Sequence, residues 1–414
     1  MLPVYYENQL VGQITEATAG ISFDYDPTWK LAPLNFGISL TMPFREMKYG
    51  SEIAAPWFAN LLPEDRILEQ VGRLLGRSQG DVYGLLEEIG RETAGALSIG
   101  GPEPIDKADY RNLSDKELKD VIERLPSRPL LAGEGEVTMS LAGAQTKLAI
   151  AIFDEKIALP LHGAASTHIL KPKSDRLYAT VENELLCMRL ASELGLNIPA
   201  TSMRVVDGHP FLLVQRYDRK IVSPGRVERI HQEDICQALG IYPTQKYEAR
   251  RGPGLVDLYR IVDTHAQRRA RDRLALLDLI IFACCIGDTD RHGKNYSLIL
   301  SHGGARLAPG YDLISALSYD GITRNLAMKI AGKNRAEQLE RRHWERFAEE
   351  VRLSPAATVR RVEELASAAT ERLLEVKKAL IDEYPVNRDA LELFAAKIQE
   401  RARRIGKNSL KNSK

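Results

Sequence analysis

Residues 287–300, "GDTDRHGKNYSLIL", bring together side chains that can do chemistry. Two aspartates, a histidine, a lysine and an asparagine fall within the eight positions from Asp288 to Asn295. An apolar stretch, "LALLDLIIFACCIG", ends at this loop, and the apolar run "YSLIL" follows it. A loop that only meets solvent does not need this set of groups, so its composition predicts a chemical role.

The spacing of these groups matches what phosphoryl transfer requires. Asp290 and Asn295 are separated by four residues, as in the catalytic loop of protein kinases, where the aspartate orients the attacking hydroxyl and the asparagine holds magnesium. Asp312, in "APGYDLIS", follows a strand and a turn, where a second magnesium ligand is expected. The pattern D-x-x-x-x-N also occurs by chance, and a polar loop whose aspartate caps a helix or turn would show it too. Ordinary kinases have H-R-D and D-F-G where this chain has "DTD" and "YDL".

The preceding half of the chain supplies further kinase-like groups in the expected order. Lys171 ends the apolar run "THILK", and Glu184 in "VENE" could pair with it at the start of a helix. "SLAGAQTK" places Ala142, Gly143 and Ala144 in a turn, where small residues let backbone N–H groups approach phosphate. The strand in "FLLVQRYDR" suits a hinge whose backbone reads an adenine. Each has an ordinary alternative: a lysine reaching solvent, a plain β-turn, a strand end.

Periodicity and turn signals predict the elements that position these groups. Strands are expected in residues 4–14 and 20–26, helices in 55–76 and 80–92, and a turn-rich connector in 100–112. Ser114 and Glu117 form a capping box. Residues 137–173 show strand, turn, strand, turn, strand, followed by a helix that ends at Gly195 and a hairpin over 201–219. From Ile230 the chain is mainly helical, with one helix capped by Ser354.

Composition sets broader expectations. With 414 residues, 44% hydrophobic and 27% charged, the chain resembles an ordinary soluble globular protein, and its net charge of +1 gives no global attraction for nucleic acid or acidic membranes. The basic end, residues 401–414, is expected to be solvated and frayed. Four cysteines without C-x-x-C spacing favour buried thiols in a reducing compartment. No signal peptide and no span long enough for a bilayer are visible, so a cytoplasmic location without membrane contact is expected.

Longer segments of the sequence resemble one family. They are "WFANLLPEDRI", "DVYGLLEEIGRETAGALSI", "SLAGAQTKLA", "THILKPK", "VENELLCMRLASELGLNIP", "QRYDR", "HQEDICQALG", "YEARRGPG", "GDTDRHGKNYSLIL" and "LAPGYDLISA". Together they are similar to the HipA family, serine/threonine kinase toxins of bacterial toxin–antitoxin systems. The resemblance covers the chain to about residue 330. It implies an α+β, two-lobed kinase-like fold, related to phosphatidylinositol kinases, with a β-rich N-terminal subdomain and a mainly helical C-terminal lobe. The expected domains are 1–105, 106–218 and 219–414.

The resemblance also implies residue roles. Asp290 would be the catalytic base, Asn295 and Asp312 the magnesium ligands, Glu184 the ion-pair partner of Lys171, and Ser140 the autophosphorylated serine. The segment 142–147 would cover the phosphates, and residues 215–217 would be the hinge. The expected ATP-binding set is Ala142, Gly143, Ala144, Gln145, Thr146, Lys147, Lys171, Gln215, Arg216, Tyr217, His292, Lys294, Asn295, Tyr311 and Asp312.

The implied activity is that of an ATP- and magnesium-dependent serine/threonine protein kinase. Implied partners are a HipB-like helix-turn-helix antitoxin, an aminoacyl-tRNA synthetase as substrate, and operator DNA reached through the antitoxin. Many relatives have glutamate at the position of Gln215, a change that backbone recognition survives. Arg291 and Gly293 also depart from the family pattern and are expected on the rim of the loop, where they would tune the substrate.

Two other classes stay open. The "DTD" sequence could be the nucleophile pair of a D-x-D phosphatase, although such a pair follows a strand and here a helix-like run precedes it. A kinase scaffold without activity could act only as a co-repressor, although every required catalytic residue type is present.

Overall fold

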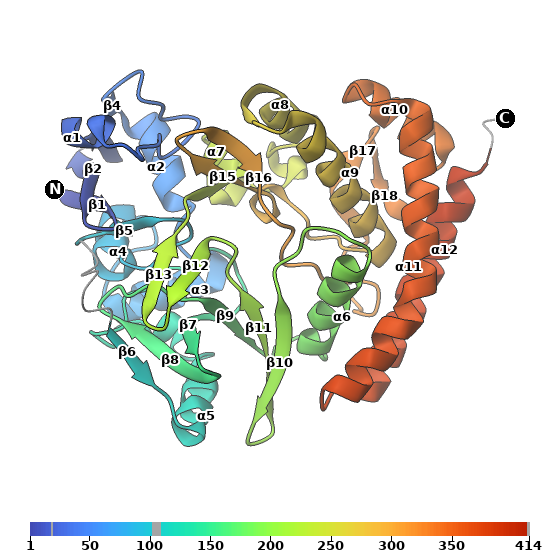
Figure 1. The fold of residues 1–414 in the computed structure, drawn as a ribbon, viewed down its shortest axis with the longest axis horizontal. Coiled ribbons are helices and arrows are strands. Elements are labelled where there is room, and N and C mark those ends of the chain that lie inside the picture. The colour runs from blue at the N-terminus through green and yellow to red at the C-terminus, as the bar shows by residue number, and fades with distance from the viewer. Residues whose placement is uncertain (18–19, 102–108, 412–414) are drawn as a thin grey trace. The chain divides into compact units, whose positions relative to one another are not determined.

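The computed structural model describes residues 1–17, 20–101 and 109–411, and the chain divides into two compact units (Figure 1). Unit 1 comprises Met1–Pro172, Arg204–Thr244 and Leu298–Ala305, and unit 2 comprises Lys173–Met203, Gln245–Ser297 and Arg306–Lys414. Strands dominate unit 1 and helices dominate unit 2, which confirms the α+β class with a β-rich N-terminal part and a helical C-terminal part. The three predicted domains stay a prediction, and their first boundary lies outside the described residues.

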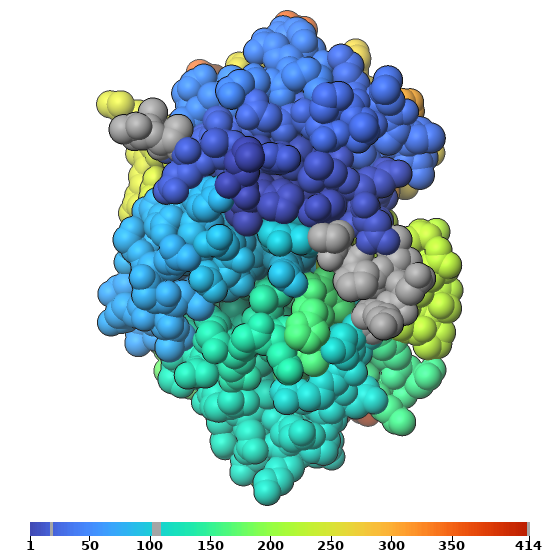
Figure 2. All heavy atoms as spheres, turned by 90° about the vertical axis from the view of Figure 1, so that its left-hand side faces the viewer, coloured from blue at the N-terminus to red at the C-terminus, as the bar shows by residue number. Residues whose placement is uncertain are grey.

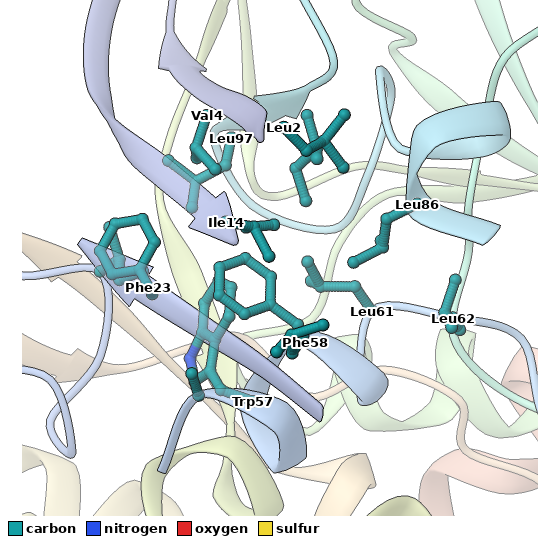
Figure 3. Packing of buried hydrophobic residues seen from close by; sticks show 14 of the residues in the cluster. Leu2, Val4, Ile14, Phe23, Trp57, Phe58, Leu61, Leu62, Leu86 and Leu97 are labelled. Atoms are coloured by element: carbon teal, nitrogen blue, oxygen red, sulfur yellow. The ribbon is translucent and has the colours of Figure 1, made fainter. Parts of the chain in front are cut away.

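An antiparallel five-stranded sheet with the order β4-β3-β2-β1-β5 begins unit 1. Its strands are β1 (Leu2–Tyr6), β2 (Gln9–Ala17), β3 (Gly20–Tyr25), β4 (Lys48–Tyr49) and β5 (Leu97–Ile99). Alternate side chains of a strand share one face, and on this sheet Val4, Ile14 and Phe23 are fully buried. They join Trp57 and Phe58 in one hydrophobic core (Figure 3). The strand predicted for residues 20–26 is confirmed, whereas the run 4–14 forms two strands, β1 and β2, with a turn at Glu7 and Asn8 between them.

The helices that complete this core are α2 (Ser51–Ala59), α3 (Asp65–Leu75) and α4 (Val82–Ile89). The prediction of one helical stretch over residues 55–76 is wrong, because the chain breaks between α2 and α3. Pro63 lies in the break and disfavours a helical conformation for the residue before it. At the end of α2, the side-chain amide of Asn60 donates to the Pro56 carbonyl at 2.8 Å. The break matters because residues 61–64 contact the predicted phosphate loop.

A six-stranded sheet with the order β10-β11-β9-β7-β8-β6 carries the predicted lysine and hinge. Its strands are β6 (Asp109–Asn112), β7 (Leu148–Phe153), β8 (Lys156–Leu161), β9 (His168–Pro172), β10 (Thr201–Val206) and β11 (His209–Gln215). The β10–β11 hairpin is confirmed. So is the capping box of α5 (Asp115–Arg124), in which the Glu117 carboxylate accepts from the Ser114 N–H at 2.9 Å. In Figure 2 the blue atoms of the first hundred residues lie against the blue-green atoms of α5 and its sheet.

Two local predictions in this sheet are wrong. Residues 109–112, expected in a connector, form β6 because Tyr110 packs edge-on against Phe153, with ring centroids 5.0 Å apart, and donates its hydroxyl to the Ala165 carbonyl at 2.9 Å. The rest of the expected connector, residues 102–108, lies outside the described residues. Residues 137–141, expected as a strand, form only an isolated bridge between Met139 and Glu92.

Smaller elements complete the strand-rich part. They are α1 (Pro27–Leu31), the hairpin β12 (Arg219–Ser223) and β13 (Arg226–Arg229), α7 (Ile235–Ala238), and a three-stranded sheet of β14 (Gln232–Asp234), β15 (Ser297–Ser301) and β16 (Gly304–Leu307) in the order β14-β15-β16.

Unit 2 is built from long helices around the buried helix α9 (Arg269–Ile286), which precedes the predicted catalytic loop. Its elements are α6 (Thr180–Glu193), α8 (Leu255–His265), α9 (Arg269–Ile286), α10 (Arg341–Glu350), α11 (Pro355–Glu383), α12 (Arg388–Ser409), β17 (Asn325–Ile330) and β18 (Lys333–Arg335). Helix α9 packs against α11 and α12, and its last seven residues, 280–286, are all buried. Its one charged residue among these apolar turns, Asp278, receives two hydrogen bonds from Arg361 of α11, at 2.7 and 2.8 Å. The predicted buried core helix and the Ser354 cap of α11 are therefore confirmed.

The expectation of a frayed basic end is wrong for residues 401–409. These residues belong to α12, where Ala402, Ile405 and Ser409 are buried at helical spacing while the arginines between them reach outward. Residues 412–414 lie outside the described part. The four cysteines are free and buried, as predicted. Among the described residues, no helix is long and apolar enough to cross a membrane.

Candidate active site

The loop after α9 folds around the backbone of Asp290. Gly287 ends the helix with a left-handed φ of +69°, which turns the chain out of the helical direction. The Asp290 carbonyl then accepts from the His292 N–H at 2.8 Å and from the Asn295 side-chain amide at 2.9 Å. Because one carbonyl holds both later residues, the loop presents Asp290, His292 and Asn295 in a fixed arrangement within unit 2.

The carboxylate of Asp290 is exposed, as a group that must meet a second molecule requires. The Tyr247 hydroxyl donates a hydrogen bond to it. The Tyr247 ring lies edge-on to His292, with centroids 4.9 Å apart. Tyr247 belongs to the "YEARRGPG" segment, but nothing in its local sequence predicts this contact, since 43 positions separate it from Asp290.

Asp288 lies beneath this loop as a second, buried carboxyl group. It is 1% exposed, and its Oδ1 accepts from the Asp290 N–H at 3.0 Å. Burial raises its pKa from 3.8 to about 7; Arg291 and the Asp290 N–H oppose that rise, and the negative charges of Asp290 and Asp312 add to it. The electrostatic effects of two other carboxyl groups, those of Asp290 and Asp312, therefore meet at Asp288.

Arg291 and Gly293 are buried, so the prediction that they lie on the loop's rim is wrong. The Arg291 guanidinium lies over the Tyr296 ring, 4.7 Å from its centroid, and donates to the Tyr311 carbonyl at 3.0 Å. Its Nη1 is 3.8 Å from Asp288 Oδ2. An arginine that bridges the loop and the Tyr311 segment supports the site from inside and does not meet a substrate.

The segment around Asp312 is held to the loop by Tyr311. The Tyr311 hydroxyl donates to the Lys294 carbonyl at 2.6 Å and lies 2.7 Å from the Ser297 hydroxyl. Asp312 is half-buried and has a left-handed φ of +57°, an uncommon conformation that aspartate tolerates better than most residues. Residues held in such sparsely populated backbone conformations cluster at functional sites.

The predicted phosphate loop lies in unit 1, against the break between α2 and α3. The Glu64 N–H donates to the Gly143 carbonyl at 3.2 Å, and the Ser140 hydroxyl donates to the Leu61 carbonyl at 2.8 Å. Gly143 has a φ of +110°, a backbone conformation that strains any residue with a side chain, so the turn favours glycine here. The Lys147 ammonium group donates to the Ala142 carbonyl. Ala144, Gln145 and Thr146 lie in the same loop.

Lys171 and the predicted hinge also lie in unit 1, on paired strands. Lys171 of β9 is 6% exposed and pairs in register with Leu212 of β11. At the end of β11, the Arg216 N–H already donates to the Thr167 carbonyl at 2.9 Å. Any backbone contact of Arg216 with a base would therefore use its carbonyl. Gln215 and Tyr217 flank it.

The structure thus collects the predicted residues in two groups. Unit 2 contains Glu184, Asp290, His292, Lys294, Asn295, Tyr311 and Asp312; unit 1 contains Ser140, the 142–147 loop, Lys171 and the 215–217 hinge. Since Lys171 and Glu184 belong to different units, their predicted ion pair stays a prediction. Glu184 is buried in α6.

The residues present suit magnesium. Mg²⁺ keeps several waters and takes one or two carboxylates together with substrate phosphates, so Asp312 and Asn295 are an adequate donor set. The negative charges of Asp290 and Asp312 both act on the Asp288 carboxyl group, so carboxyl groups gather at this end of the loop, which is an electrostatic setting that favours a dication. Nowhere in residues 1–17, 20–101 and 109–411 do three or more His, Cys, Asp or Glu side chains form a metal-binding group, and a magnesium site of this kind does not require one.

Comparison with known proteins agrees with this geometry. Residues 2–100 match the family model of the HipA N-terminal domain, and residues 139–373 match that of the HipA-like C-terminal domain. The chain belongs to the HipA family. The Y4mE protein of Sinorhizobium fredii is 35% identical over 413 residues, covering 98% of each chain.

HipA of Shewanella oneidensis is matched both as a sequence and as a solved structure. The serine/threonine-protein kinase toxin HipA of that organism is 30% identical over 344 residues, covering 80% of this chain and 78% of its own. The solved Shewanella oneidensis MR-1 complex of HipA, HipB and operator DNA contains a chain that matches this one over the full length of both, with a TM-score of 0.86 and 25% identity.

Proposed function

We propose that this HipA-family chain is an ATP- and magnesium-dependent serine/threonine protein kinase. The observation that carries the proposal is the arrangement in unit 2: an exposed Asp290 carboxylate whose backbone carbonyl holds Asn295, beside the Tyr311–Asp312 segment. Phosphoryl transfer requires this combination of a hydroxyl-orienting carboxylate and an amide–carboxylate metal pair.

In the proposed reaction, the side chains of the chain divide the work as follows. Asp290 accepts the proton of the attacking hydroxyl, and Tyr247 fixes the direction of the Asp290 carboxylate. Asn295 and Asp312 hold Mg²⁺, which when bound neutralises charge on the phosphates. Lys171 and the loop 142–147 bind the phosphates, and the hinge 215–217 reads the base through its backbone. His292, Lys294 and Tyr311 complete the expected nucleotide site.

The direct test is transfer of radiolabelled phosphate from ATP to a generic protein substrate. Asp290→Asn should lower transfer by about 10²–10⁴-fold while ATP binding persists, since a base acts on the hydroxyl and not on the nucleotide. Asp382→Asn, an exposed position on α11, is the matched control and should leave transfer unchanged. Equal transfer by wild type and Asp290→Asn would overturn the proposal.

The proposed biological role is that of a toxin in a toxin–antitoxin module. The support is the family and the solved Shewanella oneidensis relative, whose complex contains HipB and operator DNA. A HipB-like helix-turn-helix antitoxin is the expected partner, with operator DNA bound mainly through it. The expected substrate is an aminoacyl-tRNA synthetase, whose phosphorylation would halt translation. Incubating the kinase with a panel of purified synthetases tests this substrate class, and transfer to none of them would remove it.

A second candidate function is co-repression without catalysis. The same solved assembly favours it, because a HipA chain there is part of an operator complex. Measuring growth arrest in cells that express wild type or Asp290→Asn distinguishes catalysis from co-repression. If Asp290→Asn arrests growth as wild type does, catalysis is not the cause; if the variant is harmless yet still retards operator DNA together with the antitoxin, the chain performs both roles.

Autophosphorylation of Ser140 is the proposed means of inactivation. Ser140 is fully buried, and its hydroxyl donates to a carbonyl oxygen. A phosphate there adds about −1.5 to −2 charges next to an acceptor and cannot be accommodated, so the loop that follows would leave its place. Mass spectrometry of the peptide containing "VTMSLAGAQTK" after incubation with ATP should find phosphate in wild type and none in Asp290→Asn. An unmodified peptide from an active enzyme would refute this switch and leave the kinase intact.

A further inference from the structure

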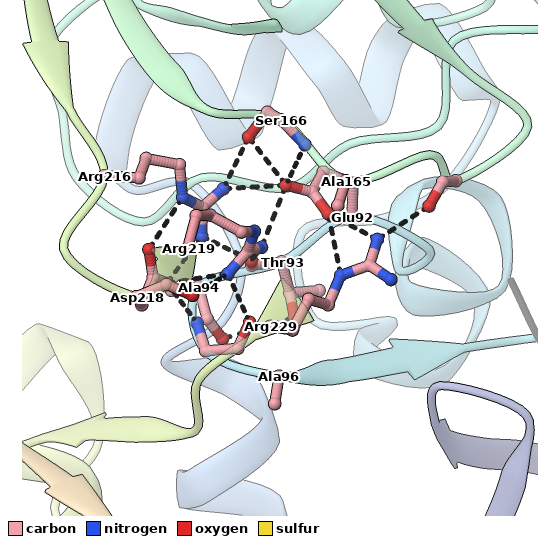
Figure 4. Close-up of polar contacts among 12 residues, drawn as sticks. Glu92, Thr93, Ala94, Ala96, Ala165, Ser166, Arg216, Asp218, Arg219 and Arg229 are labelled. Atoms are coloured by element: carbon pink, nitrogen blue, oxygen red, sulfur yellow. Dashed lines mark hydrogen bonds and ion pairs between the residues drawn. The ribbon is translucent and has the colours of Figure 1, made fainter. Parts of the chain in front are cut away.

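Glu92 stands at the centre of a buried polar network in unit 1 (Figure 4). Its carboxylate accepts six hydrogen bonds: two from Ser166, one from Arg216, one from Arg219 and two from Arg229. The guanidinium distances to its oxygens run from 2.6 to 3.2 Å. Every lone pair of this carboxylate is used, so any shift of one partner is felt by the others.

A second carboxylate completes the network from the hinge side. Asp218 accepts from Arg216 Nε at 2.8 Å and from the Gly95 N–H at 2.7 Å. Three arginines therefore contact these two carboxylates, and all five side chains are at most 5% exposed. Burial by itself raises the pKa of Glu92, but Arg219, Arg229 and Arg216 together hold that pKa well below its usual range.

The backbone of Glu92 has a separate partner. Its N–H donates to the Thr138 carbonyl at 3.1 Å, and its carbonyl accepts from the Ser140 N–H at 2.8 Å. Ser140 is two residues before the phosphate loop begins at Ala142. Glu92 thus holds the loop's entrance through its backbone and the hinge residue Arg216 through its side chain. Both segments are predicted nucleotide contacts, and both belong to unit 1.

We propose that Glu92 is a positioning residue for nucleotide binding, which fixes the hinge relative to the phosphate loop and transmits release of the Ser140 segment to the hinge. This inference rests on the proposed kinase function, because it assumes that the hinge and the phosphate loop bind ATP. Glu92 does not touch the nucleotide; it acts through Arg216 and Ser140. When the segment 138–140 separates from the Glu92 backbone, the Glu92 backbone is no longer held in place. Its carboxylate then no longer holds Arg216, Arg219 and Arg229 in fixed positions.

A purely structural role would give a different result, and charge-matched variants distinguish the two. Glu92→Gln removes one negative charge from the network. Adding Arg229→Met removes one positive charge, so the double variant has the net charge of wild type but still lacks the Glu92 carboxylate. If Glu92 served only charge balance, the double variant would behave as wild type.

The measurement is steady-state kinetics with ATP as the varied substrate. Both Glu92→Gln and the double variant should raise KM for ATP by about tenfold or more and leave kcat within about twofold, because the predicted catalytic groups at Asp290 lie in unit 2. Asp278→Asn, which breaks the α9–α11 ion pair in unit 2, is the matched control for lost stability and should leave KM unchanged. An unchanged KM in the folded Glu92 variants, or a wild-type KM in the double variant, would overturn the inference.

A second readout does not depend on kinase activity. Hydrogen exchange of the backbone should accelerate together in residues 138–147 and 215–219 in Glu92→Gln, and acceleration in only one of these segments would overturn the inference. If Glu92→Gln does not fold, Glu92→Asp takes its place. The aspartate keeps the negative charge, but its shorter side chain cannot reach both Arg216 and Arg229. Loss of ATP turnover in wild type would instead count against the proposed function, and the exchange result would still stand.

Discussion

The buried carboxyl group of Asp288 gives a pH dependence of stability that the structure makes quantitative. Asp288 is 1% exposed, and burial, opposed by Arg291, raises its pKa from 3.8 to about 7. Burial and the negative charges of Asp290 and Asp312 favour the neutral form in the folded protein, while the Asp290 N–H, which donates to Oδ1, and Arg291, 3.8 Å from Oδ2, oppose this effect. The perturbation that tests this is Asp288→Asn, which keeps the acceptor oxygen and removes the titration.

The sign follows from proton linkage. The folded pKa is raised, so between pH 3.8 and 7 the folded state binds one proton more than the unfolded state and stability falls as pH rises. The favourable contribution is complete below pH 3.8 and is lost when pH has passed about 7. At 1.36 kcal/mol per pH unit, the two units from pH 5 to pH 7 correspond to about 2.7 kcal/mol, an order-of-magnitude figure.

Urea unfolding in the presence of a chelator measures this from pH 5 to pH 8. Other groups titrate in the same range: the buried His168 and His231, whose pKa values burial lowers to about 4, give the opposite slope. The difference between Asp288→Asn and wild type removes these shared contributions. We expect that difference in unfolding free energy to grow in favour of the variant by about 2–3 kcal/mol from pH 5 to pH 7 and then to level off. A difference that stays constant with pH refutes the reasoning.

Three further predictions concern the site and its support. Asp312→Ala and Lys171→Ala should each weaken ATP binding in the presence of magnesium, which titration calorimetry measures, and unchanged affinity in both would remove the nucleotide-site assignment. Tyr247→Phe keeps the ring beside His292 but loses the donor to Asp290, so kcat should fall by about tenfold with little change in KM for ATP. Asp278→Asn should lower the free energy of unfolding by about 1 kcal/mol, a modest figure because its arginine partner on α11 is 37% exposed, and chemical denaturation should leave the slope with urea unchanged.

Local features of this chain could be predicted because their causes are local. The capping box at Ser114, the buried character of α9 and the strands of the first sheet depend on spacings within a few residues. The order of Asp290, Asn295 and Asp312 was also visible, since a catalytic loop places its groups by sequence spacing. Local signals failed at β6, because Tyr110 pairs with Pro160 of β8 and packs against Phe153 of β7, both more than forty positions away.

The supports of the site could not be predicted, because they join residues far apart in the sequence. Tyr247 meets Asp290 across 43 positions, and Glu92 meets Arg229 across 137. In neither pair does the local sequence around one residue predict its contact with the other. Arg291 shows the same difficulty within one loop. As a departure from the family pattern it is expected on the loop's rim, but it is buried, with its guanidinium over the Tyr296 ring and donating to the Tyr311 carbonyl. The position of a buried charged residue depends on its partners in the tertiary structure. These partners leave no periodicity or spacing in the sequence from which they could be predicted.

The burial of Ser140 has a consequence for the timing of the proposed inactivation. A hydroxyl that donates to the Leu61 carbonyl and is fully buried cannot also meet a phosphate donor, so the segment 138–140 must open before it reacts. Opening breaks the Ser140–Glu92 backbone hydrogen bond and the Ser140–Leu61 hydrogen bond, each worth about 1 kcal/mol net, together with the burial of Met139 and Leu141. Autophosphorylation should therefore proceed more slowly than phosphorylation of an exposed substrate hydroxyl. The enzyme would act on its target for many turnovers before it silences itself.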